Sequence, residues 1–238
     1  KHQTMHTPTQ LGTKDGGNYY INSHKLMAFF LTKSCFIHTP KCGGRWIKKH
    51  LNNITTITDK EYDEGFLGQK NTEHYAPTWE ELGDKKPFAF VRHPITWLAS
   101  LHNHRIRKKS KYATDGNWFG SRFPLEKLGD NDWHRFVKNV CGYTGWIQEY
   151  FDMHVGQYDN KILIGKMENI EEDLITILQQ LDEPFDIEKI RGQGKNLHRA
   201  KIEGTMKRVK ALTQKEIDAL YESQKITFEK YGYTKDFS

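Results

Sequence analysis

The sequence has few cysteines and no long apolar run. Its three cysteines, Cys35, Cys42 and Cys141, are odd in number and far apart, which argues against a disulfide framework and against a zinc site of paired CxxC motifs. The longest apolar stretch, residues 26–31, has the length of a strand, whereas a membrane span needs roughly 20 residues. The N-terminus also lacks the regions of a signal peptide. We therefore expect a soluble, cytoplasmic protein without a membrane span, or a Golgi lumenal one if a leader or anchor was removed.

Neither sign of charge dominates. Lysine and arginine number 36 against 30 acidic residues, a net charge of +6, which suits an anionic ligand but does not require nucleic acid as a partner. The 238 residues are in the range of one α/β domain with a buried core. Residues 1–24 are polar and without a sustained period, so we expect an N-terminal arm there and a single domain over 25–238.

Apolar runs and helical stripes alternate along this domain. Strands are predicted near 26–31, 35–38, 88–91 and 161–165, and a short helix is predicted after Pro77. Longer helices are predicted from Trp46, from Pro94, over 132–151 as one or two helices, over 170–181, and over a last stripe from Ile217 to Phe228. The basic segment 191–201 is expected to be a loop. This alternation predicts an α/β, three-layer fold with a central parallel sheet flanked by helices.

A glycine pair connects the second predicted strand to the helix after it, in the sequence FIHTPKCGGRW of residues 36–46. Glycines let the backbone approach an anion, and the N–H groups at a helix start stabilise it. An ordinary P-loop places its lysine after the glycines and follows it with a hydroxyl that holds magnesium. Here Lys41 precedes Gly43, and no such hydroxyl follows. The loop therefore predicts a phosphate or sulfate site of another kind, and a plain tight turn is the alternative.

A second strand-to-helix unit carries Arg92 at the strand end and Ser100 eight residues later. An arginine in this place can bind a phosphate through two parallel N–H bonds, and a serine two turns into the helix can add a hydroxyl donor. The alternative is that Arg92 pairs with a surface carboxylate and that Ser100 is only a small helix residue.

Together these two units resemble the sulfotransferases that use 3′-phosphoadenosine-5′-phosphosulfate (PAPS). The Pro-Lys-x-Gly-x-x-Trp pattern that begins at Pro40 resembles their 5′-phosphosulfate loop, and its Gly-Gly form is similar to the carbohydrate-type and bacterial branches. The spacing of Arg92 and Ser100 resembles their 3′-phosphate element. The resemblance implies a P-loop-like fold, PAPS as donor and adenosine 3′,5′-bisphosphate (PAP) as product. The implied acceptor is a hydroxyl or amine of a small molecule, glycan or peptide.

The resemblance also implies roles for the residues of the first loop. Lys41 would stabilise the leaving group, and the backbone N–H groups of Cys42, Gly43, Gly44, Arg45 and Trp46 would bind the phosphosulfate. Arg45 stands where relatives often have Thr or Ser. Trp46 is either an adenine platform or the first core residue of its helix. Transfer of this kind needs positioning and electrostatic stabilisation, without a metal or a covalent intermediate.

Two further segments resemble the same family. Residues 73–77, between the two cofactor loops, are similar to a histidine-containing segment, which implies His74 as general base, with Glu73 as the fallback. Residues 195–199 resemble a basic loop that closes over the 3′-phosphate, which implies Lys195 and Arg199 as ligands.

Residues 166–170 resemble the family's Glu-Asn-Leu segment after a core strand; Met167 stands where relatives often have an aromatic residue near the adenine, and methionine can also pack on a base. Residues 228–233 resemble a common family ending, for which we expect a structural role. His102 and His104 lie two apart on a predicted helix and point away from each other, so we expect no metal site there. Cys42 is interpreted as a small loop residue rather than a nucleophile. Residues 111–130 are expected to contact the acceptor. Two alternative functions stay open, namely an inactive nucleotide-binding module and a P-loop-like small-molecule kinase.

Overall fold

The computed structural model describes residues 28–54, 76–107, 128–191 and 199–236, so the predicted N-terminal arm lies outside the described residues. One sheet contains four strands in the order β1-β2-β3-β4. They are β1 (Ala28–Phe30), β2 (Ser34–Ile37), β3 (Lys86–Val91) and β4 (Leu163–Lys166). Strands β2, β3 and β4 are parallel, and β1 is antiparallel to β2. The expectation of an α/β fold is confirmed, and the sheet is mostly parallel.

The first strand corrects the prediction of a wholly parallel sheet. Only residues 31–33 separate β1 from β2, too few for the crossover that two parallel strands require. The buried carboxylate of Glu183 stabilises this turn from across the fold. It accepts hydrogen bonds from the N–H groups of Thr32 (2.7 Å) and Lys33 (2.9 Å) and from the hydroxyl of Ser34 (2.7 Å).

Helices follow each parallel strand, and several begin at residues that favour helix starts. Pro94 is the first residue of its helix, and Thr78 forms a capping box with Glu81. The helical segments are α1 (Gly44–Ile54), α3 (Trp79–Leu82), α4 (Pro94–Arg107), α6 (Trp133–Cys141), α7 (Trp146–Val155), η3 (Gly156–Lys161), η4 (Met167–Asn169), α8 (Ile170–Gln180), α9 (Ile187–Arg191), α10 (Arg199–Lys210), α11 (Gln214–Ser223) and α12 (Lys225–Lys230). None of these described helices is long and apolar enough to cross a bilayer.

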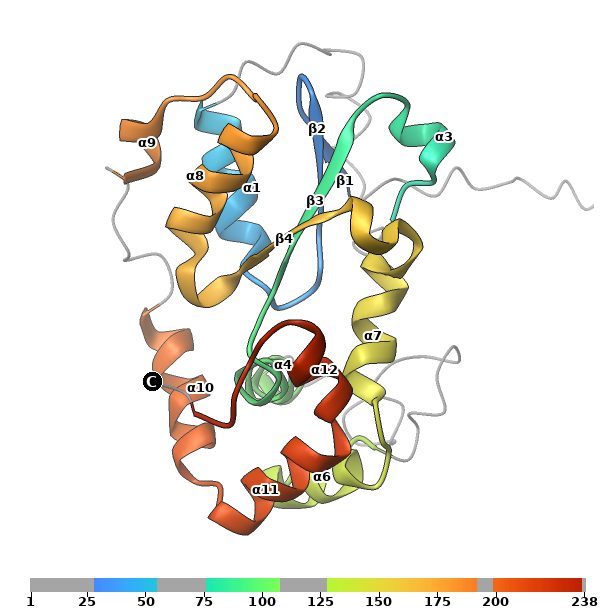
Figure 1. The fold of residues 1–238 in the computed structure, drawn as a ribbon. Helices are drawn as coiled ribbons and strands as arrows, with labels where there is room; N and C mark the ends of the chain where they lie inside the picture. Colours follow the sequence, from blue (N-terminus) through green and yellow to red (C-terminus); the bar gives the residue numbers. More distant parts are fainter. Residues whose placement is uncertain (1–27, 55–75, 108–127, 192–198, 237–238) are drawn as a thin grey trace, which may run out of the picture.

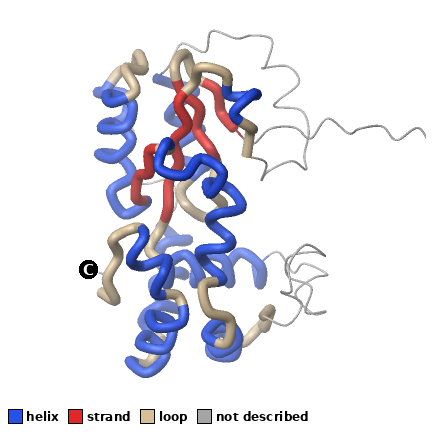
Figure 2. The backbone as a smooth tube through the Cα atoms, turned by 45° about the vertical axis from the view of Figure 1, so that its right-hand side comes forward, coloured by secondary structure: helices blue, strands red, loops and turns tan. Residues whose placement is uncertain are grey.

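The two faces of the sheet are covered by different helices, as Figures 1 and 2 show. Side chains alternate between the faces of a strand. Phe36, Phe88 and Phe90 therefore share one core with the apolar residues of α1 and α8. Cys35 and Ala89 lie in a second core, which includes residues of α3 and η3. The sheet is thus the middle layer between two layers of helices.

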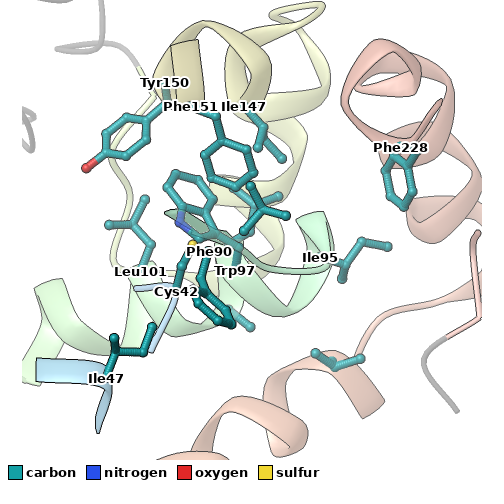
Figure 3. Close-up of a cluster of buried hydrophobic side chains, with 14 of the residues drawn as sticks. Cys42, Ile47, Phe90, Ile95, Trp97, Leu101, Ile147, Tyr150, Phe151 and Phe228 are labelled. Carbon is teal, nitrogen blue, oxygen red and sulfur yellow. The ribbon is translucent and has the colours of Figure 1, made fainter. Parts of the chain in front are cut away.

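A group of helices lies beyond the carboxyl ends of the parallel strands, with α4 at its centre (Figure 1). Trp97 of α4 is fully buried there, and its ring centroid lies 4.8 Å from that of Tyr150 and 5.4 Å from that of Phe151. Figure 3 shows these α7 side chains on one side of Trp97 and Cys42 of the glycine loop close by. The core that supports the loop is therefore largely aromatic.

Two predictions for the C-terminal part are wrong. The single helix expected from Ile217 to Phe228 is divided into α11 and α12 at Gln224, which is fully buried. The Gln224 side chain accepts a hydrogen bond from the N–H of Ile147 and donates to the carbonyl of Tyr143, and these contacts hold the bend. The predicted loop 191–201 also ends in helix, because α10 begins at Arg199 and packs along α4.

Candidate functional site

The candidate site lies where the three parallel strands end. Parallel strands present their carboxyl ends at one edge of the sheet, which is the usual location of ligands in open α/β folds. The segments that follow the strands are in contact with one another at this edge. Arg92 Nη1, after β3, donates to the carbonyl of Lys41, after β2, over 3.4 Å, and the N–H of His93 donates to Glu168 Oε1, after β4, over 2.9 Å. The two cofactor-binding units predicted from the sequence are thus brought together.

The loop between β2 and α1 is a tight turn with two residues in the left-handed region. Lys41 has φ 67° and Gly43 has φ 83°, and a lysine in this region is uncommon. The N–H of Cys42 donates to Thr39 (3.3 Å) and that of Trp46 to Gly43 (2.8 Å). These two N–H groups are therefore engaged within the loop and the start of α1. The N–H groups of Gly44 and Arg45 belong to the first turn of a helix, where N–H groups have no partner within the helix.

Close packing requires both glycines. A Cβ on Gly43 would lie 2.4 Å from Ile170 Cδ1, and a Cβ on Gly44 would lie 2.0 Å from the ring of His38. Met167 of η4 is also next to the loop, since its Cγ lies 3.6 Å from the same Gly43 position. The loop is therefore a tight turn, a geometry that both of the predicted alternatives, an anion site and a plain turn, allow, and it brings its backbone against the segment after β4.

Arg92 is buried, with only 8% of its surface exposed. Its Nε donates to Thr96 Oγ1 over 2.9 Å, and Nη1 reaches the Lys41 carbonyl. Within the described part of the chain Arg92 forms no ion pair. Its hydrogen bonds to Thr96 and Lys41 engage two of its five N–H groups. Burial lowers the pKa of Arg92, and the nearby charge of Glu168 raises it. The site thus contains a buried guanidinium with donors left for an anion.

Trp97 and Cys42 both contact the carbonyl oxygen of Pro40 in the loop between β2 and α1. The indole N–H of Trp97 donates to the carbonyl of Pro40 (2.9 Å), and the thiol of Cys42 contacts the same oxygen at 3.5 Å. Burial raises the pKa of the Cys42 thiol far above its usual range. The sulfur is therefore a neutral, buried group, in agreement with its interpretation as a loop residue rather than a nucleophile.

The remaining side chains of the loop point in different directions. Arg45 is exposed on the first turn of α1. Trp46 is half-buried and stacks on His50, with ring centroids 3.6 Å apart and planes at 25°. Burial lowers the pKa of His50 and favours its neutral form. One face of the Trp46 ring is thus covered by its own helix.

The other predicted site residues differ in how much of each the structure describes. Ser100 is half-buried on α4, in the second turn after Pro94. Arg199 is the first residue of α10, and its side chain is outside the described part of the chain. His74, Glu73 and Lys195 lie outside the described residues, as does the segment 108–127.

Sequence reasoning missed four residues of this edge. Thr96 lies one helical turn after Arg92, a spacing that could have suggested the contact. No role was expected for Glu168 and only a structural one for the segment of Tyr233, yet Tyr233 donates to Glu168 over 2.8 Å directly beside the site. The His93 ring nitrogen Nε2 donates to the carbonyl of Thr234 over 2.9 Å.

His102, which the sequence excluded as a metal ligand, has a structural role. Its Nε2 donates to the carbonyl of Asp130 (3.0 Å), and its Nδ1 accepts a hydrogen bond from Arg208 Nε (2.8 Å). Among the described residues, no group of three or more histidine, cysteine or acidic side chains is arranged to hold a metal ion.

Comparisons with known proteins assign no family to the chain. No family model matches it, and a search of curated proteins finds no significant match.

Proposed function

We propose that this protein is a PAPS-dependent sulfotransferase with a P-loop-like donor site at the carboxyl edge of its sheet. The observation that carries the proposal is the contact of Arg92 with the Lys41 carbonyl, which joins the two sequence units that resemble the 5′-phosphosulfate and 3′-phosphate elements. A donor with phosphate groups on the 3′ and 5′ positions of one ribose needs two such anion sites close together.

The charges and donors at this edge support the proposal. The phosphosulfate would bind to the N–H groups of Gly43, Gly44 and Arg45, where the helix dipole favours negative charge. The 3′-phosphate would bind to the unused N–H groups of Arg92, whose hydrogen bonds a buried environment strengthens. Ser100 would add a hydroxyl from α4.

In the reaction, the acceptor oxygen attacks the sulfur while the bond from sulfur to the bridging phosphate oxygen breaks, and PAP leaves with that electron pair. Lys41 would stabilise the charge that develops on the bridging oxygen, an effect worth about 3 kcal/mol for one well-placed donor. The proton of the acceptor would pass to His74, with Glu73 as the fallback base. The acceptor itself would be a small molecule, glycan or peptide.

The test combines PAP binding with transfer of labelled sulfate from PAPS to a panel of acceptors. Lys41→Ala should lower the transfer rate about 100-fold or more while weakening PAP binding less. Arg92→Ala should weaken PAP binding about 10- to 150-fold, because it removes charge-assisted hydrogen bonds, and should weaken binding of AMP, which lacks the 3′-phosphate, much less. A normal transfer rate in Lys41→Ala would refute the proposed mechanism.

Lys86→Ala is the matched control. Lys86 is exposed at the amino end of β3, so the variant makes the same change in charge at the opposite edge of the sheet. Its PAP binding and transfer rate should equal those of the wild type.

The same ligands distinguish the two alternative functions. Stabilisation by PAP without transfer to any acceptor would favour an inactive nucleotide-binding module. Stabilisation by ATP with magnesium but not by PAP would favour a small-molecule kinase.

A further inference from the structure

The segment after α12 returns to the strand ends and makes contacts at the same edge as Arg92. Gly232 has φ 61°, which turns the chain, and the N–H of Tyr233 donates to the carbonyl of Phe228 over 2.8 Å. Lys166 Nζ, at the end of β4, donates to the Gly232 carbonyl (3.1 Å) and lies 4.7 Å from the centre of the Tyr233 ring. The Tyr233 side chain is thereby fixed between the ends of β3 and β4.

Glu168 lies at the centre of these contacts. Its Oε1 accepts from the N–H of His93 and its Oε2 from the hydroxyl of Tyr233, so that each carboxylate oxygen has a donor. Glu168 is close enough to Arg92 for its charge to raise the pKa of the guanidinium, yet the two residues form no ion pair within the described part of the chain. The carboxylate thus balances the charge of Arg92 without occupying its donors.

An unrestrained carboxylate at this position would behave differently. Arginine and carboxylate groups form strong bidentate pairs when both are free to align. Such a pair would place the carboxylate oxygens on the donors that a phosphate would use. Burial and the charge of Glu168 raise the pKa of Tyr233 far above its usual range, so its hydroxyl keeps the proton that it donates.

We infer that Tyr233 is a positioning residue, whose hydroxyl holds Glu168 away from Arg92 and so keeps the guanidinium available to an anionic ligand. The inference rests on the proposed function only for the identity of that ligand, the 3′-phosphate of PAP.

Affinities for PAP and AMP in four proteins test this role, since only PAP carries the 3′-phosphate. Tyr233→Phe should reduce the preference for PAP over AMP about two- to ten-fold, the range expected for one hydrogen bond. Glu168→Gln alone should keep a preference for PAP at least as strong as that of the wild type, because a neutral amide forms no ion pair with Arg92 and no longer balances its charge. The double variant, Tyr233→Phe with Glu168→Gln, should regain that preference. A purely structural role of Tyr233 would instead weaken PAP and AMP alike, without rescue, and this result would overturn the inference.

Tyr221→Phe is the matched control. Tyr221 is half-buried on α11, and its hydroxyl makes no hydrogen bond within the described part of the chain. It should bind both nucleotides as the wild type does.

A crystal structure of Tyr233→Phe separates this inference from the proposed function. Glu168 should form a direct ion pair with Arg92 in the variant, and a Glu168 that stays on His93 alone would overturn the inference whatever the ligand. A wild type without any preference for PAP would instead contradict the proposed function, and the crystal structure would still decide the role of Tyr233.

Discussion

The indole N–H of Trp97 donates a hydrogen bond of 2.9 Å to the carbonyl oxygen of Pro40. Arg92, five residues earlier, contacts the next carbonyl along the loop, that of Lys41. The helix that follows β3 therefore holds the loop that follows β2 at two successive peptide groups. This link makes the geometry of the glycine loop after β2 depend on the second strand-to-helix unit.

Trp97→Phe should destabilise the protein by about 2–4 kcal/mol, because it leaves the buried Pro40 carbonyl with only the weak thiol donor of Cys42 and removes part of a ring from an aromatic core. Chemical denaturation measures this change. Trp79→Phe is the control, since Trp79 is 42% exposed and its indole donates over a longer distance to Gln157. The control should lose less than about 1 kcal/mol. Equal losses in the two variants would contradict the proposed support of the loop by Trp97.

Gly44→Ala should destabilise the protein by about 1–3 kcal/mol, because its Cβ would overlap the ring of His38, which must then move. Gly204→Ala is the matched change on α10. There the nearest atom to the added Cβ, the amide nitrogen of Asn103, lies at an ordinary contact distance of 3.7 Å. Because alanine favours a helix over glycine, this variant should gain about 0.5–1 kcal/mol. Melting temperatures that shift in the same direction would refute the packing argument.

Glu183→Gln should destabilise the protein by about 1.5–3 kcal/mol, because an amide nitrogen cannot accept from the Lys33 N–H and the Ser34 hydroxyl as the carboxylate does. Urea denaturation at neutral pH measures the loss. Glu229→Gln, an exposed change on α12, should alter the free energy of unfolding by less than about 0.5 kcal/mol. A Glu183→Gln variant as stable as this control would show that the turn after β1 does not depend on the carboxylate.

Stability should fall in mild acid because of His102. Burial and the neighbouring Arg208 lower the pKa of His102 from its ordinary value of 6.5 to about 4. Between these two pH values His102 binds a proton more readily in the unfolded chain than in the folded one. The contribution of His102 to the free energy of unfolding is therefore complete above about pH 6.5 and is lost as the pH falls toward 4. The loss amounts to about 2–3 kcal/mol.

The free energies of unfolding at pH 7 and pH 4.5 test this dependence. Between pH 7 and pH 4.5 the free energy of unfolding of the wild type should fall by about 2 kcal/mol more than that of His102→Gln, because glutamine cannot take up the proton. Identical pH profiles would remove His102 as the source.

The units that carry the candidate site could be predicted because their signals are local. An apolar run, a glycine pair and an apolar helical stripe follow one another within residues 35–54, and Pro94 marks the start of α4 two residues after Arg92. Such patterns depend on neighbours in the sequence, so one sequence is enough to read them.

The remaining contacts could not be predicted because they join distant residues without a periodic pattern. Tyr233 and Glu168 are 65 positions apart, and the break at Gln224 depends on carbonyl groups near Tyr143, 81 positions away. Helix α10 was missed because it is strongly polar, and its pairing with α4 stabilises it in place of a clear apolar stripe.

The separations of the contacts at the strand ends have a consequence for folding. The bonds from Arg92 to Lys41, from His93 to Glu168 and from His93 to Thr234 span 51, 75 and 141 positions. Contacts between such distant residues form slowly, because closing a long loop costs entropy before any contact repays it. Local helices should therefore appear early, and the strand ends should meet last. If the proposed donor site binds PAP, a fluorescent PAP analogue added during refolding would report the final step of folding rather than the collapse of the chain.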